Sequence, residues 1–186
     1  MNESESVIDA ALAALNIHNP IYSFFMALGT GLGIASIAII SQYIGANRKD
    51  LAQKYAARLM FLSVILAIAV SFLFLITSDM IFGHSLFAYW MGARGQTLEF
   101  ASSYFFIRSF EFIFVFTFIV YQAILQASGE TVRPVILNMS GMLFDMLLTW
   151  LFVSKLNMGV DGAGLATLLG HAIIFPFIIY DLFFSK

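Results

Sequence analysis

The stretch that decides the fold of this chain is residues 21–44, which read IYSFFMALGTGLGIASIAIISQYI. This stretch contains no charged residue. A helix needs about 20 consecutive apolar residues to cross the hydrocarbon core of a bilayer. Because lipid offers the backbone no hydrogen-bond partner, a span of this length is expected to be helical. We therefore predict a transmembrane helix here, in which Gly29, Gly31 and Gly33 are positions of close helix packing.

Four further stretches are long and apolar enough to cross a membrane. They lie at about 57–77, 100–127, 135–153 and 165–184. The predicted fold class is an all-α integral membrane protein with about five transmembrane helices. Residues 1–17, in which apolar side chains share one helical face, are predicted to form an amphipathic N-terminal segment, and residues 18–186 to form the helical membrane domain.

The composition agrees with a membrane protein and excludes several other classes. The chain is 61% hydrophobic and 11% charged, with a mean hydropathy of +0.91, whereas soluble domains are about 45–50% apolar and about 25% charged. The net charge of −2 provides no basic field, so we predict the lipid bilayer as a partner and no nucleic acid. The absence of Cys excludes disulfides, thiolate catalysis and Cys-based zinc sites.

The orientation in the membrane follows from the basic residues of the connecting segments. Loops rich in Lys and Arg stay in the cytoplasm. The side that carries the N-terminus, segment 78–99 and segment 154–164 holds only Arg94 and Lys155. We therefore predict a multi-pass protein of the inner (cytoplasmic) membrane, with the N-terminus outside and the C-terminus cytoplasmic. The basic residues of the cytoplasmic side are Arg48, Lys49, Lys54, Arg58, Arg133 and Lys186.

Asp145 is the carboxylate that the apolar spans accommodate least easily. It lies ten residues after Val135, which places it about 15 Å into a core about 30 Å thick. An ionised carboxylate at that depth costs about 2.5–3.5 kcal/mol on insertion scales, so Asp145 should face the protein interior or a watery cavity. Asn138, Asp145 and Thr149 form one polar stripe on the helix. We predict these three residues as a coupling-ion or substrate site, with a structural hydrogen-bonded Asp145 as the alternative.

Arg108 and Glu111 form a second polar group within a predicted span. At a spacing of three residues they can share one helical face and neutralise each other. They are read as an ion pair or as part of a polar pathway. Neither HExxH nor GxSxG occurs, and His18, His84 and His171 are far apart in the sequence. We therefore predict no enzyme, no catalytic residues, no metal site and no cofactor, and read His171 as a packing or cavity residue.

Three segments resemble one family of membrane transporters. Residues 12–57, LAALNIHNPIYSFFMALGTGLGIASIAIISQYIGANRKDLAQKYAA, are similar to the second helix of multidrug and toxic compound extrusion (MATE) transporters and the basic loop that follows it. Residues 104–138, YFFIRSFEFIFVFTFIVYQAILQASGETVRPVILN, resemble the fourth helix, its turn and the Pro that opens the fifth. Residues 158–167, MGVDGAGLAT, resemble the Gly-rich start of the sixth helix.

This resemblance implies a secondary antiporter that exports organic, often cationic, compounds in exchange for H⁺ or Na⁺. The chain would supply helices two to six of an incomplete six-helix N-terminal lobe. The implied partners are small organic cations or drugs, and a second lobe or another copy of the chain. The alternative is a helical membrane protein that does not transport and serves as an assembly or partner subunit.

The family pattern does not transfer to the polar stripe without change. The fifth helix of the family commonly has Asn, and Asp four residues later. Counting back from Gly159, these positions are Asp145 and Thr149 in this chain. The carboxylate is therefore displaced by one helical turn, about 6 Å along the axis.

Overall fold

The computed structural model describes residues 3–78 and 83–184. All regular structure in these two ranges is helical, which confirms the predicted all-α class. The order along the chain is α1 (Glu3–Gly45), α2 (Lys49–Ile76), α4 (Leu86–Trp90), α5 (Gly95–Ser109), α6 (Glu111–Ala127), α7 (Val132–Thr149), the π-helix η1 (Trp150–Lys155) and α8 (Gly159–Phe184).

Five spans are present if one bent pair of helices counts as a single span. The helices α1, α2 and α8, and the run Val132–Lys155 that joins α7 to η1, are each long and apolar enough to cross a membrane. The sequence predicts one straight helix over 100–127, but this span is bent in the structure. It consists of α5 and α6, which meet at an angle of 45°. The Ser109 hydroxyl donates to the carbonyl of Phe106 at 2.6 Å, so a backbone acceptor beside the bend is satisfied without water.

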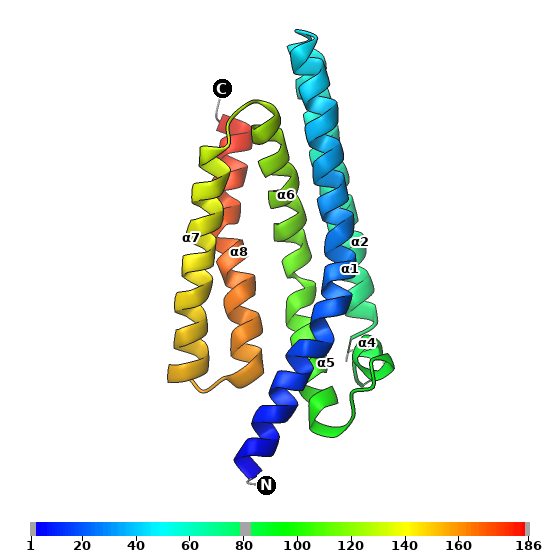
Figure 1. The fold of residues 1–186 in the computed structure, drawn as a ribbon, viewed down its shortest axis with the longest axis vertical. Coiled ribbons are helices and arrows are strands. Elements are labelled where there is room, and N and C mark those ends of the chain that lie inside the picture. The colour runs from blue at the N-terminus through cyan, green and yellow to red at the C-terminus, as the bar shows by residue number, and fades with distance from the viewer. Residues whose placement is uncertain (1–2, 79–82, 185–186) are drawn as a thin grey trace.

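The N-terminal segment is continuous with the first span. From Glu3 onward it belongs to α1, so its described part is the beginning of a long helix instead of a separate one. Pro20 lies inside α1, where a proline removes one backbone hydrogen bond and commonly kinks a helix without ending it. Figure 1 shows that the N-terminal part of α1 runs obliquely to the rest of the helix, and that the N- and C-termini lie at opposite ends of the bundle.

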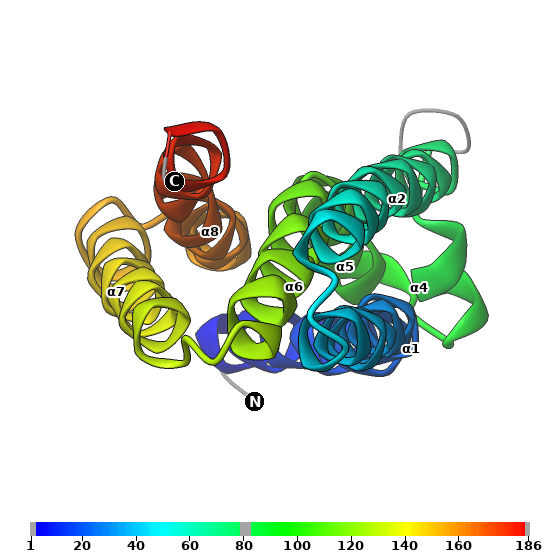
Figure 2. The ribbon, with the colours of Figure 1, turned by 90° about the horizontal axis from the view of Figure 1, so that it is seen from above.

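The bundle is organised around α6. Figure 2 shows α6 between the pair α1 and α2 on one side and the pair α7 and α8 on the other, and α6 packs against α1, α2 and α8. Gly29 and Gly33 permit the close approach of α1 to α6. A Cβ at Gly29 would lie 2.8 Å from the Phe116 ring, and one at Gly33 would lie 2.7 Å from Ile119. At one edge of the bundle, α7 packs mainly against α8.

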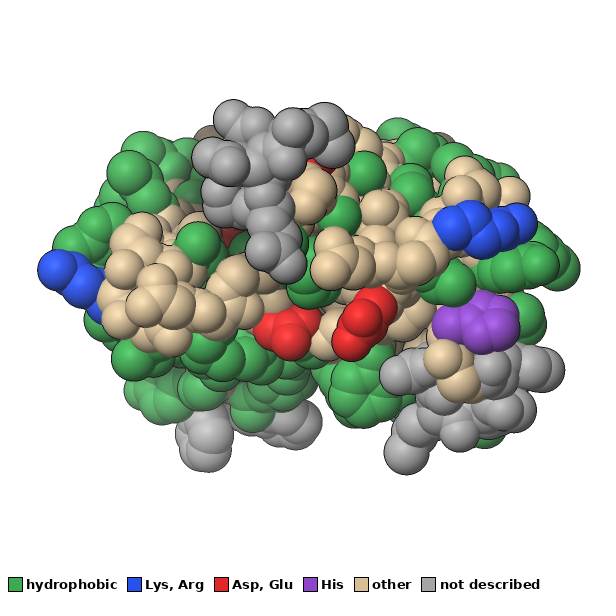
Figure 3. Space-filling view, turned by 90° about the horizontal axis from the view of Figure 1, so that it is seen from below, with side chains coloured by type: hydrophobic (Ala, Val, Ile, Leu, Met, Phe, Trp, Pro, Cys, Tyr) green, Lys and Arg blue, Asp and Glu red, His purple; other side chains and the backbone are tan. Residues whose placement is uncertain are grey.

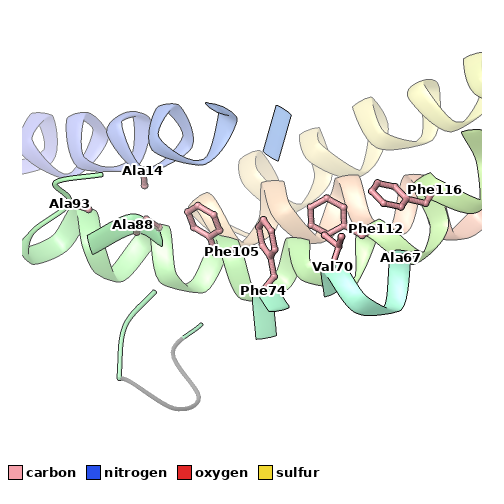
Figure 4. Packing of buried hydrophobic residues seen from close by; sticks show 10 residues of the cluster. Ala14, Ala67, Val70, Phe74, Ala88, Ala93, Phe105, Phe112 and Phe116 are labelled. Atoms are coloured by element: carbon pink, nitrogen blue, oxygen red, sulfur yellow. The ribbon is translucent and has the colours of Figure 1, made fainter. Parts of the chain in front are cut away.

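A row of aromatic rings fills the core where α2, α5 and α6 meet. Phe74 lies 5.8 Å from Phe105 and 4.8 Å from Phe112, measured between ring centroids. Figure 4 shows the Phe105, Phe74, Phe112 and Phe116 rings in sequence along this core. Rings at these separations attract one another in addition to the burial of their surface. The bend between α5 and α6 is therefore held from the α2 side by packed aromatic side chains.

Polar groups gather at the ends of the bundle. Figure 3, the view from the end that carries the N-terminus, shows hydrophobic side chains around the rim, with acidic side chains nearer the middle. At the opposite end, Asp181 of α8 accepts hydrogen bonds from Tyr121 of α6 at 2.7 Å and from Arg133 of α7 at 2.6 Å. One carboxylate thus connects three helices at the end that carries the C-terminus.

Gly170 is the glycine at which a side chain is expected to disturb the fold most directly. A Cβ there would lie 2.9 Å from Cβ and 3.2 Å from Cα of Asp145. Gly170→Ala should therefore force α7 away from α8, with a cost of about 1–3 kcal/mol in the free energy of unfolding. Gly31→Ala is the matched control, because a Cβ at Gly31 would meet nothing within 4 Å. Thermal unfolding in detergent should show a lower Tm for Gly170→Ala only, and equal Tm values would contradict this account.

Candidate functional site

Asp145 lies where α7 crosses α8. It is half-buried, and it faces Gly170 at the close approach of the two helices. Gly141, one turn before Asp145, also lies in this crossing, since a Cβ there would meet the Ile174 side chain. Two glycines on facing helices therefore bring the Asp145 backbone against α8. The carboxylate lies at a helix–helix contact.

A small cavity opens beside Asp145. Its volume is about 30 Å³, which is room for a water-sized guest. Asn138 is exposed on α7 and borders the same cavity. The full lining consists of Phe118, Asn138, Gly141, Met142, Asp145, His171 and Ile174.

Thr149 completes the predicted stripe from one turn further along α7. Its hydroxyl donates to Oδ1 of Asp145 at 3.3 Å. Asn138, Asp145 and Thr149 therefore lie along one side of α7, with the carboxylate between an amide and a hydroxyl. This arrangement offers one charged and two neutral oxygen-bearing groups to a small guest.

Arg108 and Glu111 stand on either side of the bend between α5 and α6. Arg108 lies in the last turn of α5 and Glu111 is the first residue of α6. The distance from Nη1 of Arg108 to Oε2 of Glu111 is 2.7 Å, and the two side chains are 9% and 0% exposed. The Tyr22 hydroxyl donates to Oε1 of Glu111 at 3.0 Å, and the Arg108 guanidinium lies 4.6 Å from the centroid of the Tyr22 ring. The charge pair is thus enclosed by α1 as well as by its own span.

His171 joins the two polar groups that the sequence treats separately. Its Nδ1 lies 3.5 Å from Oε1 of Glu111 and 3.0 Å from the carbonyl oxygen of Thr167. The same ring borders the cavity of Asp145. The sequence places His171 within an apolar span but does not reveal which neighbouring helices it faces. The position of α8 between α6 and α7 supplies that information.

Among the described side chains, of residues 6–78 and 83–182, no three His, Asp or Glu groups come together in a way that could hold a metal ion. The chemistry available here is therefore that of an arginine, two carboxylates, a histidine and neutral oxygen donors. Such groups bind protons or small cations and exchange hydrogen bonds. Ionisable residues inside a membrane commonly mark ion or proton pathways.

Comparison with known proteins assigns the class of this bundle. The family model MatE matches residues 6–151. The chain is 25% identical, over 92% of its length, to the multidrug export protein MepA of Staphylococcus saprophyticus. It also resembles the inward-facing structure of a multidrug resistance MATE family transporter of the MOP superfamily, with 29% identity and a TM-score of 0.85 over 95% of this chain and 39% of that chain. The outward-facing structure of such a transporter matches with 29% identity and a TM-score of 0.85 over 94% of this chain and 37% of that chain. The chain belongs to the MATE family of multidrug efflux transporters.

The chain spans 37% of the length of the MepA relative that it matches. It therefore corresponds to a partial lobe of such a transporter. The TM-score is the same, 0.85, against the inward-facing and the outward-facing structures. The fold of this chain is therefore recognisable in both conformations of that transporter. The relatives are an export protein and a transporter.

Proposed function

We propose that this chain acts as helices two to six of a secondary antiporter that exports organic, often cationic, compounds in exchange for H⁺ or Na⁺. Membership of the MATE family supports the transport class. The observation that carries the ion-coupled mechanism is the half-buried Asp145, which borders a small cavity inside an apolar span. A carboxylate inside a membrane span costs several kcal/mol, and a role in binding the coupling ion would account for that cost.

In this mechanism the coupling ion neutralises Asp145. The Thr149 hydroxyl is the neutral partner that orients the carboxylate, and the Asn138 amide is a second neutral group at the same cavity. Neutralisation changes the balance between packings in which Asp145 is enclosed and packings in which it is open to water. In this mechanism the lobe moves as a body, as in alternating access of secondary transporters. A second lobe, or another copy of this chain, would be the body against which it moves.

The direct test is efflux of a fluorescent organic cation such as ethidium. Cells that express the longest reading frame containing this chain should lose ethidium faster than vector controls, and collapse of the ion gradients should stop the difference. Efflux equal to the control would contradict the transport function and would favour a non-transporting partner subunit.

The proposed orientation can be tested with single cysteines, because the chain contains none of its own. Ser128 follows α6 at the end that carries the C-terminus, and Met158 precedes α8 at the other end; both are exposed. A membrane-impermeant maleimide is expected to label Met158→Cys in intact cells, and Ser128→Cys only after the membrane is permeabilised. The reverse pattern would place the C-terminus outside and overturn the proposed orientation.

A further inference from the structure

We propose that His171 binds a proton between the two carboxylates Glu111 and Asp145, and that this proton neutralises the interior of the lobe. The inference rests on the proposed antiport in one respect, because it makes H⁺ the coupling ion. The inference adds His171 of α8, as a proton-binding residue, to the polar stripe of α7. It also connects that stripe to the bend between α5 and α6.

The contacts of His171 determine where its hydrogen lies. The Thr167 carbonyl oxygen, 3.0 Å from Nδ1, can only accept a hydrogen bond. The second group near Nδ1 is Oε1 of Glu111 at 3.5 Å, which accepts as well when the carboxylate is ionised. Nδ1 therefore carries the hydrogen in the neutral ring, and Nε2 holds a lone pair. A proton can be added at Nε2 while both contacts of Nδ1 are kept.

The charges around His171 do not balance while its ring is neutral. Arg108 contributes one positive charge, and Glu111 and Asp145 contribute one negative charge each, so the cluster carries a net charge of −1 while His171 is neutral. Uncompensated charge is costly inside a membrane protein. One proton on His171 brings the sum to zero. The buried pair Arg108–Glu111 already balances itself, and the proton therefore compensates Asp145.

The helices packed against α8 bring the other groups that matter for this proton. Arg108 opposes it, but its guanidinium is held by Glu111 at 2.7 Å. Glu111 and Asp145 attract it, and the Tyr22 and Tyr104 side chains enclose the Arg108 guanidinium. The ammonium of Lys155 in η1 lies over the Trp150 ring. These groups come from α5 (Tyr104, Arg108), α6 (Glu111), α7 (Asp145), α1 (Tyr22) and η1 (Lys155).

Proton uptake at this position acts on the bent span. Glu111 is the first residue of α6, directly after the bend of 45°. A charged imidazolium attracts the Glu111 carboxylate more strongly than a neutral ring does, so a proton on His171 tightens the contact between α8 and the bend. Loss of the proton weakens that contact and leaves Asp145 uncompensated. The protonation of one residue thereby affects two helix contacts at once.

The test measures protonation directly and does not depend on transport. The chain is placed in lipid nanodiscs and labelled with ¹⁵N-histidine, and the His171 signal is assigned by its disappearance in His171→Gln. NMR spectra between pH 5 and 8 should show protonation of His171. At pH 6 the protonated fraction should fall severalfold in Glu111→Gln and in Asp145→Asn, and should be unchanged in Glu99→Gln, an exposed carboxylate on α5.

A His171 ring that stays neutral over this pH range would overturn the proposal, and so would a protonated fraction that neither variant changes. If Glu111→Gln fails to fold, Asp145→Asn alone decides, because it leaves the buried ion pair intact. The proposed function is tested separately by efflux. Protonation of His171 without any efflux would contradict antiport alone, whereas efflux with a permanently neutral His171 would contradict this inference alone.

Discussion

Asp145→Asn is expected to reduce ion-coupled efflux to the level of liposomes without protein. Asparagine has the shape of aspartate, and its Oδ1 can still accept the hydrogen bond that Thr149 donates at 3.3 Å. The substitution therefore removes the charge of Asp145 and leaves the α7–α8 contact intact. Without that charge the bound ion has no carboxylate to neutralise. The measurement is uptake or release of an organic cation in proteoliposomes under an imposed H⁺ or Na⁺ gradient.

Two variants provide the controls for this experiment. Asp50→Asn removes an exposed carboxylate from the first turn of α2 and should transport normally. Thr149→Val removes one hydrogen bond to a carboxylate, worth about 1.5–3 kcal/mol, and should lower transport by at least about tenfold. Unchanged efflux in Asp145→Asn, with an unchanged response to the imposed gradient, would show that Asp145 is only a structural residue.

Glu111→Ala is expected to cause the largest loss of stability. It leaves the Arg108 guanidinium, whose side chain is 9% exposed, without the carboxylate that lies 2.7 Å away. Breaking a buried ion pair by removing one partner costs about 3–5 kcal/mol, because the remaining charge stays buried and uncompensated. The free energy of unfolding can be measured by titration with SDS in mixed micelles, followed by circular dichroism.

The double variant Arg108→Met with Glu111→Leu tests whether the stability lost in Glu111→Ala is due to the unpaired charge or to the smaller side chain. It removes both charges and keeps the volume, so it should regain most of the stability that Glu111→Ala loses. Glu130→Gln is the matched control, because Glu130 also pairs with an arginine three residues away, at 2.8 Å, but both side chains are over 40% exposed. It should change stability little. If Glu111→Ala unfolds like the native chain, the buried pair does not stabilise the fold.

The spans could be predicted from the sequence because the signal for them is local. A long apolar run such as 21–44 specifies a membrane helix without information from the rest of the chain. The break in 100–127 could not be predicted in this way. Neither Pro nor Gly occurs near Phe110, and the helix direction changes where Arg108 and Glu111 are enclosed by neighbouring helices. That bend is a tertiary effect and leaves no local sequence signal.

In the candidate site, too, the sequence allows prediction only for residues that share one helix. Asn138, Asp145 and Thr149 could be grouped from the sequence because they share one face of one helix. His171 could not be assigned to the same group from the sequence. Its neighbours depend on the rotation of α8 about its axis and on the position of α8 along α6 and α7. Gly141 and Gly170, which are 29 positions apart in the sequence, meet at that crossing. A single sequence does not state which glycines face each other.

The position of α7 at the edge of the bundle has a consequence for the electrostatics of the site. In the apolar window of this span, 6% of the residues are buried within the chain. Met142 and Met146, on either side of Asp145, are 66% and 73% exposed, and Met142 also borders the cavity. Asp145, which is itself half-buried, thus lies close to whatever covers α7. Acyl chains or a second lobe against this face would set the dielectric around Asp145, so the covering surface would itself be part of the proposed ion site.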